Sequence, residues 1–448
     1  MKKYIILSLL ILIKTYSANC QEKKWTLEDC ISYAVTNNIQ LQRQRLQTEI
    51  TEADLTQSRL NVFPSLNMGS DGRIGFGRSV DPVTNLITFK QNISHSYYIT
   101  SGITIFNGFT TLNTIAANRF MLKAGLESEK VARNSLIVDV MGQYYQVIYS
   151  KGLEEALRMQ LQSSESQLAR IKKMVETGKE ALSRQYEMES RVSANRLDYT
   201  VAANSASQAL TTLKQMLRLE SASGFDIVIP DLQNIIIPYG TFSTDSVYTL
   251  ASEALPRLKA VEYELQASRK RLAAARGYVS PRLTAGGQIF TGFYKVIGEN
   301  GANQPSYSSQ LKNNNSQAVF LSLEIPLFNN YRTGRNIKVA RIQRDETELK
   351  LEQEKLNLYT EIENACLNYN RGLDEYKAAQ ANYDFNIKSS EAVQKKFEAG
   401  LVDVTDYAIA RSTLFQAETE ALRTKLQLMI RKLTLQFYTS GEYAGLTL

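Results

Sequence analysis

Histidine and cysteine are scarce in this 448-residue sequence, and their scarcity excludes most catalytic chemistry. The single histidine, His95, lacks the nucleophile elbow and the acidic partner that a catalytic triad needs. Cys30 and Cys366 do not have the spacing of metal ligands, and we expect both to be small apolar packing residues rather than disulfide partners. The sequence also has no phosphate-binding loop and no dinucleotide fingerprint. We therefore expect no enzyme, no metal site and no cofactor.

Proline and glycine are also sparse, with 8 and 23 residues, which favours long uninterrupted helices. The formal charge of +7 is spread over alternating basic and acidic residues and forms no dense basic block. Nucleic-acid binding needs clustered positive charge to release counterions, so we do not expect it.

A long apolar run is missing after the N-terminal region. Lys2 and Lys3 precede an apolar segment at 4–13, and residues 1–20 read as a signal peptide for export. That segment is too short to span a bilayer, whose ~30 Å core needs ~20 apolar residues. No later segment comes closer, so any spanning of a membrane must be done by strands.

Cys20 has two interpretations. It is the lipidated residue of a lipoprotein signal, preceded by Ser17 and Ala18, or it is removed by ordinary cleavage that leaves Gln21 as the new N-terminus. Asn19 is an awkward residue directly before a lipidated cysteine, which favours ordinary cleavage.

What the sequence does contain is an internal duplication. The segment 103–108 (ITIFNG) recurs as 325–330 (IPLFNN), and 175–178 (VETG) recurs as 397–400 (FEAG). Both pairs have an offset of 222 residues, since 328 − 106 = 222 and 400 − 178 = 222. Each copy has the order helix, hairpin, very long helix, turn, helix.

The long segments have the period of coiled-coil helices. No proline occurs between Asn113 and Val175, where apolar residues form two interleaved seven-residue series. The first comprises Leu126, Val140, Val147, Leu161, Leu168 and Val175, and the second comprises Ile115, Leu122, Leu136, Leu157 and Ile171. Such a helix is a rod of ~95 Å at 1.5 Å per residue, which no compact core can house. We expect these rods to pack side by side.

The hairpins show the alternation of transmembrane strands. In the last strand Val319, Leu321, Leu323, Ile325 and Leu327 alternate with residues such as Ser322 and Glu324. An apolar face against lipid and a polar face inside is typical of a barrel strand. The alternative is two soluble hairpins packed on the rods. Lipid cannot satisfy open strand edges, so four strands per chain require two or three chains to close a barrel.

The chain resembles the TolC family of outer-membrane efflux proteins over nearly its full mature length. The motifs that carry this resemblance are 25–31 (WTLEDCI), 63–66 (FPSL), 325–328 (IPLF), 332–335 (RTGR) and 400–406 (GLVDVTD). The resemblance implies a mainly α fold with a transmembrane β part. It implies a homotrimer in the cell outer membrane, whose 12-stranded β-barrel is continuous with a 12-helix α-barrel in the periplasm. It also implies two partners, a periplasmic adaptor protein and an inner-membrane pump.

The expected organisation follows the duplication. The first repeat, 21–222, comprises a helix at 26–62, a hairpin at 65–106, a long helix at 112–176 and a helix at 182–219. The second repeat, 246–437, comprises a helix at 246–279, a hairpin at 282–328, a long helix at 333–398 and a helix at 405–437. An equatorial belt is expected from the linker 223–245 and the tail 438–448.

The tips of the helical hairpins are the expected functional region. Gly178 and Gly400 end the long helices in a left-handed turn, and Ser183 and Thr405 are expected to cap the returning helices. The resemblance implies that the adaptor binds at this tip. The contact candidates are Gly178, Leu182, Ser183, Gly400, Leu401, Val402 and Thr405. The alternative is that these residues only make tight turns.

Asp406 matches the family position whose carboxylates ring the closed periplasmic entrance. The alternative is an acidic residue that stabilises the first turn of a helix through its dipole. Arg184 and Ile409 stand where acidic residues are common in the family, so the contacts that lock the entrance are expected to differ.

Aromatic residues flank the strands, and either an interfacial girdle or ordinary β-propensity explains them. They are Tyr97, Tyr98, Phe106, Phe109, Phe290, Phe293, Tyr294, Phe320 and Phe328. Trp25 and the face formed by Leu27, Cys30 and Ile31 are expected to fasten the N-terminal helix to its neighbours. The rival functions are a periplasmic adaptor, which would have one helical hairpin rather than two, and a secreted coiled-coil protein, which would lack strands with a lipid-facing side.

Overall fold

The structure is a computed structural model that describes residues 24–80, 85–219, 224–230, 240, 242–298 and 305–440. It divides into two compact units. The first comprises Met1–Arg45, Glu129–Pro256 and Lys355–Leu448, and the second comprises Leu46–Ser128 and Arg257–Glu354. The expected signal peptide, with Cys20, and the tail from residue 441 lie outside the described residues.

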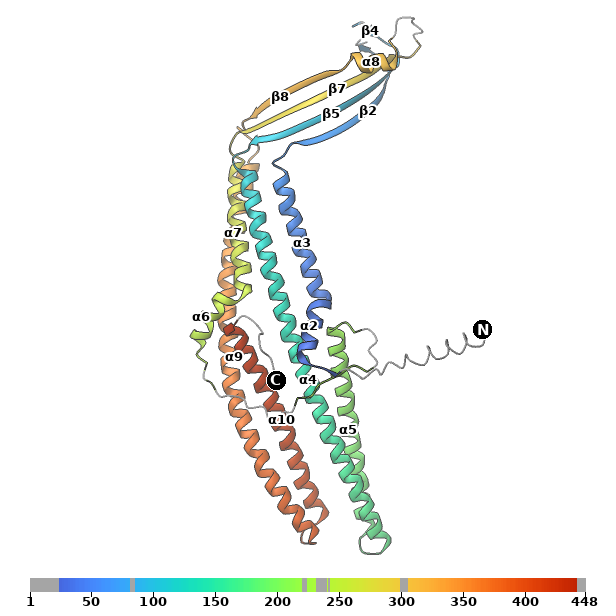
Figure 1. Cartoon of the computed structure of the whole chain (residues 1–448), viewed down its shortest axis with the longest axis vertical. Helices are drawn as coiled ribbons and strands as arrows, with labels where there is room; N and C mark the ends of the chain where they lie inside the picture. Colours follow the sequence, from blue (N-terminus) through green and yellow to red (C-terminus); the bar gives the residue numbers. More distant parts are fainter. Residues whose placement is uncertain are drawn as a thin grey trace, which may run out of the picture. The chain divides into compact units, whose positions relative to one another are not determined.

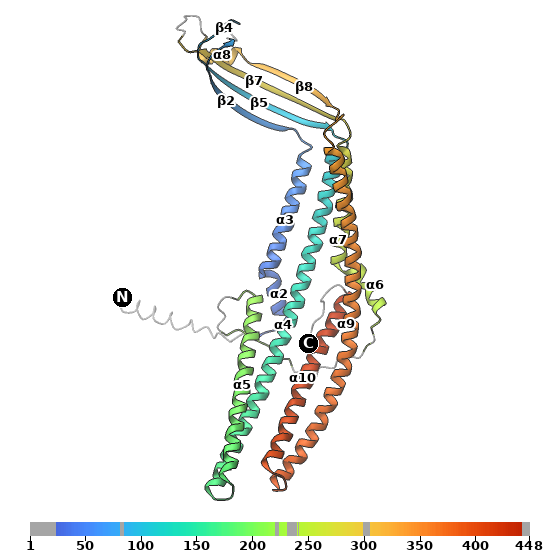
Figure 2. The ribbon, with the colours of Figure 1, turned by 180° about the vertical axis from the view of Figure 1, so that it is seen from behind.

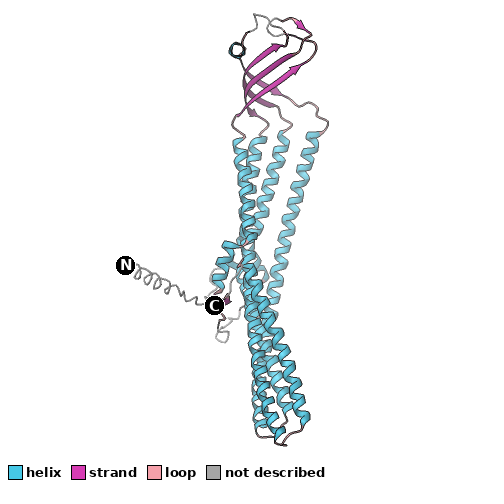
Figure 3. Cartoon of the chain, turned by 90° about the vertical axis from the view of Figure 1, so that its right-hand side faces the viewer, coloured by secondary structure: helices cyan, strands magenta, loops and turns pink. Residues whose placement is uncertain are grey.

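The described chain is mostly helical (Figure 3). Its two long helices, one in each repeat, have equal length (Figure 1). They are α4 (Thr110–Glu176) and α9 (Arg332–Glu398), each of 67 residues. Each is followed by a returning helix, α5 (Leu182–Met216) and α10 (Val404–Ser440). The absence of proline within α4 and α9 permits such lengths, because nothing interrupts the backbone hydrogen-bond ladder.

The predicted coiled-coil positions of α4 are only partly covered. Val140 and Val147 are fully buried, and Leu157 and Ile171 are nearly so. Leu126, in contrast, is 47% exposed in the single chain. The seven-residue pattern therefore found the core-facing stripe of the first unit, but it predicted more burial than one chain provides.

The two shorter helices before the hairpins are each broken, which corrects the predicted single helices at 26–62 and 246–279. The first comprises α2 (Leu27–Asn37) and α3 (Ile39–Leu60), and the second comprises α6 (Thr244–Ala254) and α7 (Pro256–Gly277). Asn38 adopts an extended conformation, and its side chain accepts a hydrogen bond of 2.9 Å from the Gln40 amide that starts α3. Leu255 is extended because it precedes Pro256, which suits the first turn of a helix.

Four antiparallel strands of the second unit form one sheet in the order β2-β5-β7-β8. They are β2 (Ser65–Gly75), β5 (Asn92–Phe106), β7 (Arg282–Val296) and β8 (Ser316–Glu324). A two-residue ribbon, β3 (Ser79–Val80) with β4 (Ile87–Thr88), follows β2. β8 ends four residues before the predicted limit of 328, near Pro326, which has no amide hydrogen to donate to a ladder.

The register of the sheet gathers the apolar residues on one face, as the alternation predicted. Met68 lies opposite Ile99, which lies opposite Ile289, and Leu321 lies opposite Ala285. Val319 is 92% exposed and Leu321 67%. We call this the apolar face of the sheet. Its members on the four strands are Leu66, Met68, Ile99, Ile103, Leu283, Ile289, Val319, Leu321 and Leu323.

The opposite, polar face holds several of the aromatic residues. Tyr98 lies over Gly69 on the neighbouring strand, where an added Cβ would meet its ring at 2.4 Å. Phe320 lies over Gly286 in the same way. Phe290 and Tyr294 also alternate onto this face, so the aromatic residues of the strands do not form one girdle.

The N-terminal segment of the first unit is held by a small polar and aromatic cluster. β1 (Lys24–Trp25) pairs in parallel with β6 (Asp226–Ile227). The Trp25 ring contacts Phe225 and, at 5.2 Å and edge-on, Tyr33 of α2. Leu27 and Cys30 of α2 are buried, so this face fastens the helix as predicted.

Buried polar groups complete the same cluster. The Tyr144 hydroxyl lies 2.7 Å from the carbonyl oxygen of Val228 and 3.2 Å from that of Trp25. Lys151 forms an ion pair with Asp226. Burial alone would raise the pKa of Asp226, but hydrogen bonds from Lys151 and from the Ile227 amide lower it.

The duplication persists in the buried positions of α2 and α6. Cys30 and Ala34 of α2 correspond to Val247 and Ala251 of α6 at an offset of 217 residues, and all four are buried. Cys30 and Cys366 are free, buried thiols, which confirms their prediction as packing residues. Burial raises the pKa of the Cys30 thiol to about 12, so it stays protonated and unreactive at neutral pH.

The Tyr144 hydroxyl is expected to stabilise the first unit. Tyr144→Phe removes the hydroxyl donor to two part-buried carbonyl groups, and we expect the free energy of unfolding to fall by ~1 kcal/mol. Tyr145→Phe is the matched control, since among the described residues its buried hydroxyl has no hydrogen-bond partner. Thermal unfolding followed by helical circular dichroism compares the two. Equal melting temperatures would show that the hydrogen bonds of Tyr144 make no net contribution to the stability of the first unit.

Within the described residues, none of the helices combines the length and the apolar character needed to cross a membrane.

Candidate functional site at the helical tips

The turn after α4 is closed by two backbone hydrogen bonds that require a left-handed residue. Gly178 has φ +70°, and its amide donates to the Val175 carbonyl at 2.9 Å. The Lys179 amide donates to the Met174 carbonyl at 2.8 Å. This pattern satisfies the last carbonyls of the helix, and glycine adopts it without a side-chain penalty.

The second copy repeats this turn after α9. Gly400 has φ +75°, its amide donates to Phe397, and the Leu401 amide donates to Lys396 at 2.8 Å. The prediction that both glycines stop their helices is therefore confirmed. The chain reverses in each case within a few residues, and α5 and α10 return beside α4 and α9 (Figures 1 and 2).

The predicted caps of the returning helices are wrong. α5 begins at Leu182 after Ala181, which makes no side-chain cap, so Ser183 lies inside the first turn. α10 begins at Val404, so Thr405 also lies inside the helix. The cap of α10 is Asp403, whose Oδ1 accepts a hydrogen bond of 2.9 Å from the Asp406 amide. Aspartate is a better N-cap than threonine, because its carboxylate also interacts favourably with the helix dipole.

Arg184 joins the two tips, which are 219 residues apart in the sequence. Its Nη2 donates to Asp403 Oδ2 at 3.2 Å, and its Nη1 donates to Thr405 Oγ1 at 3.1 Å. Nη1 also donates to Glu187 Oε2 on the same helix at 3.1 Å. We call Arg184, Asp403 and Thr405 the tip cluster. It is largely exposed, so water and salt screen its charges.

The pKa of Asp403 determines the pH range over which the contacts of the tip cluster persist. The hydrogen bond from the Asp406 amide and the contact with Arg184 lower the pKa of Asp403 below its ordinary value of ~3.9. A carboxylate with a lowered folded-state pKa contributes stability above its unfolded-state pKa and loses it as the pH falls through the folded-state value. We therefore expect the contacts of the Asp403 carboxylate to be unchanged between about pH 5 and 8. They should be lost only in stronger acid, below ~pH 4, where the carboxylate is protonated.

This pH dependence can be measured by proton–nitrogen NMR of the Asp403 and Asp406 amides or by channel current as the pH is lowered. A transition near pH 6 would contradict the assignment, because no histidine lies in this part of the chain.

A cavity of about 500 Å³ opens behind the tip cluster. Its lining includes Ile171 and Met174 of α4 and the predicted residues Gly400, Leu401 and Val402. Beside it the rings of Phe397 and Tyr407 stack with centroids 4.8 Å apart, and the Arg170 guanidinium lies 5.7 Å from the Phe397 ring.

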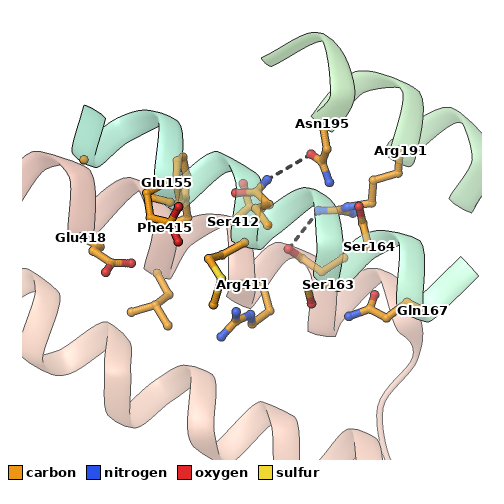
Figure 4. Close-up of a pocket in the computed structure, with 16 residues that line it drawn as sticks. Glu155, Ser163, Ser164, Gln167, Arg191, Asn195, Arg411, Ser412, Phe415 and Glu418 are labelled. Atoms are coloured by element: carbon orange, nitrogen blue, oxygen red, sulfur yellow. Dashed lines mark hydrogen bonds between the residues drawn. The ribbon is translucent and has the colours of Figure 1, made fainter. Parts of the chain in front are cut away.

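A second cavity of about 460 Å³ lies further along the same helices, between α4, α5 and α10 (Figure 4). Arg191 of α5 donates to the Ala408 carbonyl of α10 at 3.0 Å, and Gln160 of α4 donates to Asn195 of α5 at 3.1 Å. Burial lowers the pKa of Arg191. Arg411, Phe415 and Glu418 of α10 line its other wall (Figure 4).

The structure brings only some of the predicted site residues together. Thr405 and Asp406 lie in the first turn of α10, and the Asp406 carboxylate is exposed. Leu401 and Leu182 are 76% and 52% exposed. Gly178 and Ser183 are exposed on the first tip and take no part in the tip cluster.

Two residues that make structural contacts at the candidate site were missed from the sequence, Asp403 and Arg191. The first had a readable signal, since aspartate is a preferred N-cap residue and Asp403 directly precedes the start of α10. The second had none, because its partner is a backbone carbonyl more than 200 residues away. No cluster of potential metal ligands occurs among the residues whose placement is described.

Comparison with known proteins identifies the family of this chain. The sequence profile of the family described as outer membrane efflux protein matches residues 30–217 and 247–441, which cover most of both repeats. The chain belongs to the outer membrane efflux protein family. The family and its fold are those of channel proteins and not of enzymes.

Individual relatives are distant but match over nearly the whole chain. An uncharacterized protein of Haemophilus influenzae is 20% identical, covering 96% of this chain and 91% of its own length. The cation efflux system protein CusC of Escherichia coli O157:H7 is 21% identical over 92% of this chain and 85% of its own. Crystal structures of CusC match with a TM-score of 0.77, at 17% identity and 96% coverage of both chains. The CmeC outer membrane channel of Campylobacter jejuni matches with a TM-score of 0.75, at 16% identity, over 94% of this chain and 87% of its own.

Proposed function

We propose that this chain is one subunit of a homotrimeric channel that passes through the outer membrane and extends into the periplasm. It is a passive conduit that docks a periplasmic adaptor protein and an inner-membrane pump, and the pump supplies the energy. The observation that carries the proposal is the sheet of the second unit, whose apolar face is exposed in the single chain. Exposed apolar strands are costly in water and stable in lipid.

The outer edges of the sheet require further copies of the chain. Among the strands that the structure describes, β2 and β8 each pair on one side only, so each leaves a row of backbone groups open. Lipid offers these groups no hydrogen bonds, and four strands are too few to close on themselves. Three copies supply twelve strands, and the family resemblance favours three over two.

The tips of α4–α5 and α9–α10 are the proposed adaptor contact. Leu182 and Leu401 expose apolar side chains there, and Gly400, Leu401 and Val402 border the cavity behind the tip cluster. An exposed apolar side chain at the edge of a cavity, as at Leu401, fits a docked helical hairpin better than a solvated turn does. Gly178, Ser183 and Thr405 complete this surface in the proposal.

Reconstitution in planar bilayers tests the proposed channel. Purified full-length protein should insert and give discrete current steps, and the membrane fraction of cells should retain it. A periplasmic adaptor or a secreted coiled-coil protein would instead appear in the soluble fraction and leave bilayers silent.

Asp406 is proposed to line the periplasmic entrance, where three carboxylates repel anions and attract cations. Asp406→Ala should therefore reduce cation selectivity or raise the conductance several-fold in planar bilayers. Asp374→Ala is the control, since Asp374 is an exposed carboxylate of α9 remote from the tip in sequence. An unchanged current for Asp406→Ala would remove this residue from the entrance.

A further inference from the structure

The short helix α8 (Tyr307–Asn313) continues the sheet where β8 is missing. β8 pairs with β7 only as far as Phe290, and within the described part of the β7–β8 connection no strand pairs with the rest of β7 on that side. The Gln310 side chain replaces the strand, since its Oε1 accepts from the Tyr294 amide at 3.0 Å and its Nε2 donates to the Tyr294 carbonyl at 3.1 Å. Asn314 donates to the Gly292 carbonyl at 2.8 Å.

These bonds fix α8 firmly against the end of β7 that lies away from α7 (Figures 1 and 2). Gln310 is only 3% exposed, although it lies in a connection between two strands. An amide that is buried with both of its groups bonded to backbone holds one geometry. The position of α8 is therefore fixed by the fold of the second unit.

The side chains of α8 identify the face on which it lies. The Tyr307 ring contacts Phe293 at 4.8 Å and His95 at 6.4 Å, and its hydroxyl lies 2.7 Å from that of Tyr97. Phe293, His95 and Tyr97 share the face of Ile99 and Ile289, because alternate residues of a strand point the same way. The helix thus covers the apolar face and not the polar one. We call Tyr97, Phe293 and Tyr307 the aromatic platform.

The platform lies at one boundary of the apolar face. Phe293 is ten residues along β7 from Leu283, or ~33 Å at ~3.3 Å per residue, and a strand tilt of ~40° reduces this to ~25 Å of height. That is the height of the apolar band of outer-membrane barrels. At the Leu283 end, Phe106 lies opposite Leu283 and its ring contacts Phe109 at 5.5 Å. Two aromatic groups therefore bracket the apolar face.

Positive charge follows directly beyond the platform. Lys295 is the next residue of β7 on the same face, and Lys312 lies in the last turn of α8. Both are exposed, and neither forms an ion pair within the described part of the chain. The apolar-face positions of the four strands contain no aspartate or glutamate. A cation beside aromatic rings at a membrane boundary suits an anionic headgroup.

We infer that α8, the aromatic platform, Lys295 and Lys312 bind the phosphorylated headgroup of a glycolipid in the outer leaflet. The tyrosines lie at headgroup level, where their rings face the acyl boundary and their hydroxyls face water. The two lysines neutralise the phosphates. This inference rests on the proposed function, because it requires the apolar face to contact lipid.

The test uses the full-length protein in phosphatidylcholine bilayers with or without lipid A. Lipid A should raise the melting temperature of the strands in the unaltered protein. The rise should fall below half in Lys295→Glu/Lys312→Glu, and lipid A without its phosphates should not produce it. Lys338→Glu/Lys355→Glu, an equal charge change at exposed positions of α9, should keep the full rise.

Gln310→Ala provides a second, independent variant. It releases α8 from β7 while keeping both lysines, and it should also lose most of the effect of lipid A. An equal rise in all variants, or an equal rise with dephosphorylated lipid A, overturns the headgroup site. If the protein inserts and conducts but ignores lipid A, only this inference fails. If it does not enter bilayers at all, the proposed function fails with it.

Discussion

A cysteine pair at Met68 and Leu321, or at Met68 and Leu323, is expected to link three copies of the chain covalently under oxidising conditions. β2 has eleven residues and β8 has nine, and the apolar side chains of both must share one face across the seam between copies. A slip of one residue would turn a whole strand over, so only slips of two are allowed. Two registers then pair every residue of β8 with β2.

These two registers place Met68 opposite Leu321 or opposite Leu323, because 68 + 321 = 389 and 68 + 323 = 391. Opposite residues of antiparallel strands have Cα atoms ~4.5–5.5 Å apart, within the range of a disulfide. One of the two pairs should therefore convert nearly all of the protein to a covalent trimer on a non-reducing gel. The native Cys30 and Cys366 are buried and should not compete.

Met68→Cys with Ser322→Cys is the matched control. Ser322 neighbours both test positions but lies on the polar face, since it is opposite Thr284. This pair should remain monomeric on the gel. An equal yield of the disulfide-linked trimer through position 322 would show that β2 and β8 of neighbouring copies do not pair as proposed.

The second large effect is expected from Arg184→Asp at the tip cluster. The substitution replaces the donor to Asp403 and Thr405 with a carboxylate that repels Asp403. In the proposed trimer this change occurs three times around one axis. We expect a several-fold rise in single-channel conductance, which high salt should diminish by screening the repulsion.

Two further variants separate charge from structure at the same site. Asp403→Asn keeps an N-cap for α10, because asparagine caps as well as aspartate, but removes the charge. Added to Arg184→Asp, it should return the conductance towards the unaltered value. Arg158→Asp is the control, since the ion pair of Arg158 is with Glu155, one turn away on the same helix, α4. If Arg184→Asp behaves like this control, the tip cluster does not restrain the entrance.

The elements that could be predicted from the sequence are those governed by a repeating pattern. The length of α4 follows from the lack of proline and the seven-residue period, and that of α9 follows from the duplication. The apolar face follows from alternation in β8. The glycine stops after α4 and α9 follow from local backbone geometry. In each case a single energetic term, repeated along the chain, decides the outcome.

The errors have a different physical origin. The break at Asn38 and the cap at Asp403 each depend on one side chain competing with its neighbours for a backbone amide. The ion pair of Arg184 with Asp403 depends on tertiary packing that joins the two repeats, and α8 lies where it does because of the buried amide of Gln310. A periodic sequence pattern does not predict single contacts of this kind.

The mass of the purified protein in detergent tests the central claim most directly. The account predicts a particle whose protein mass is three times that of the single exported chain and which forms conducting pores when added to a bilayer. A monodisperse monomer that stays soluble without detergent would contradict it.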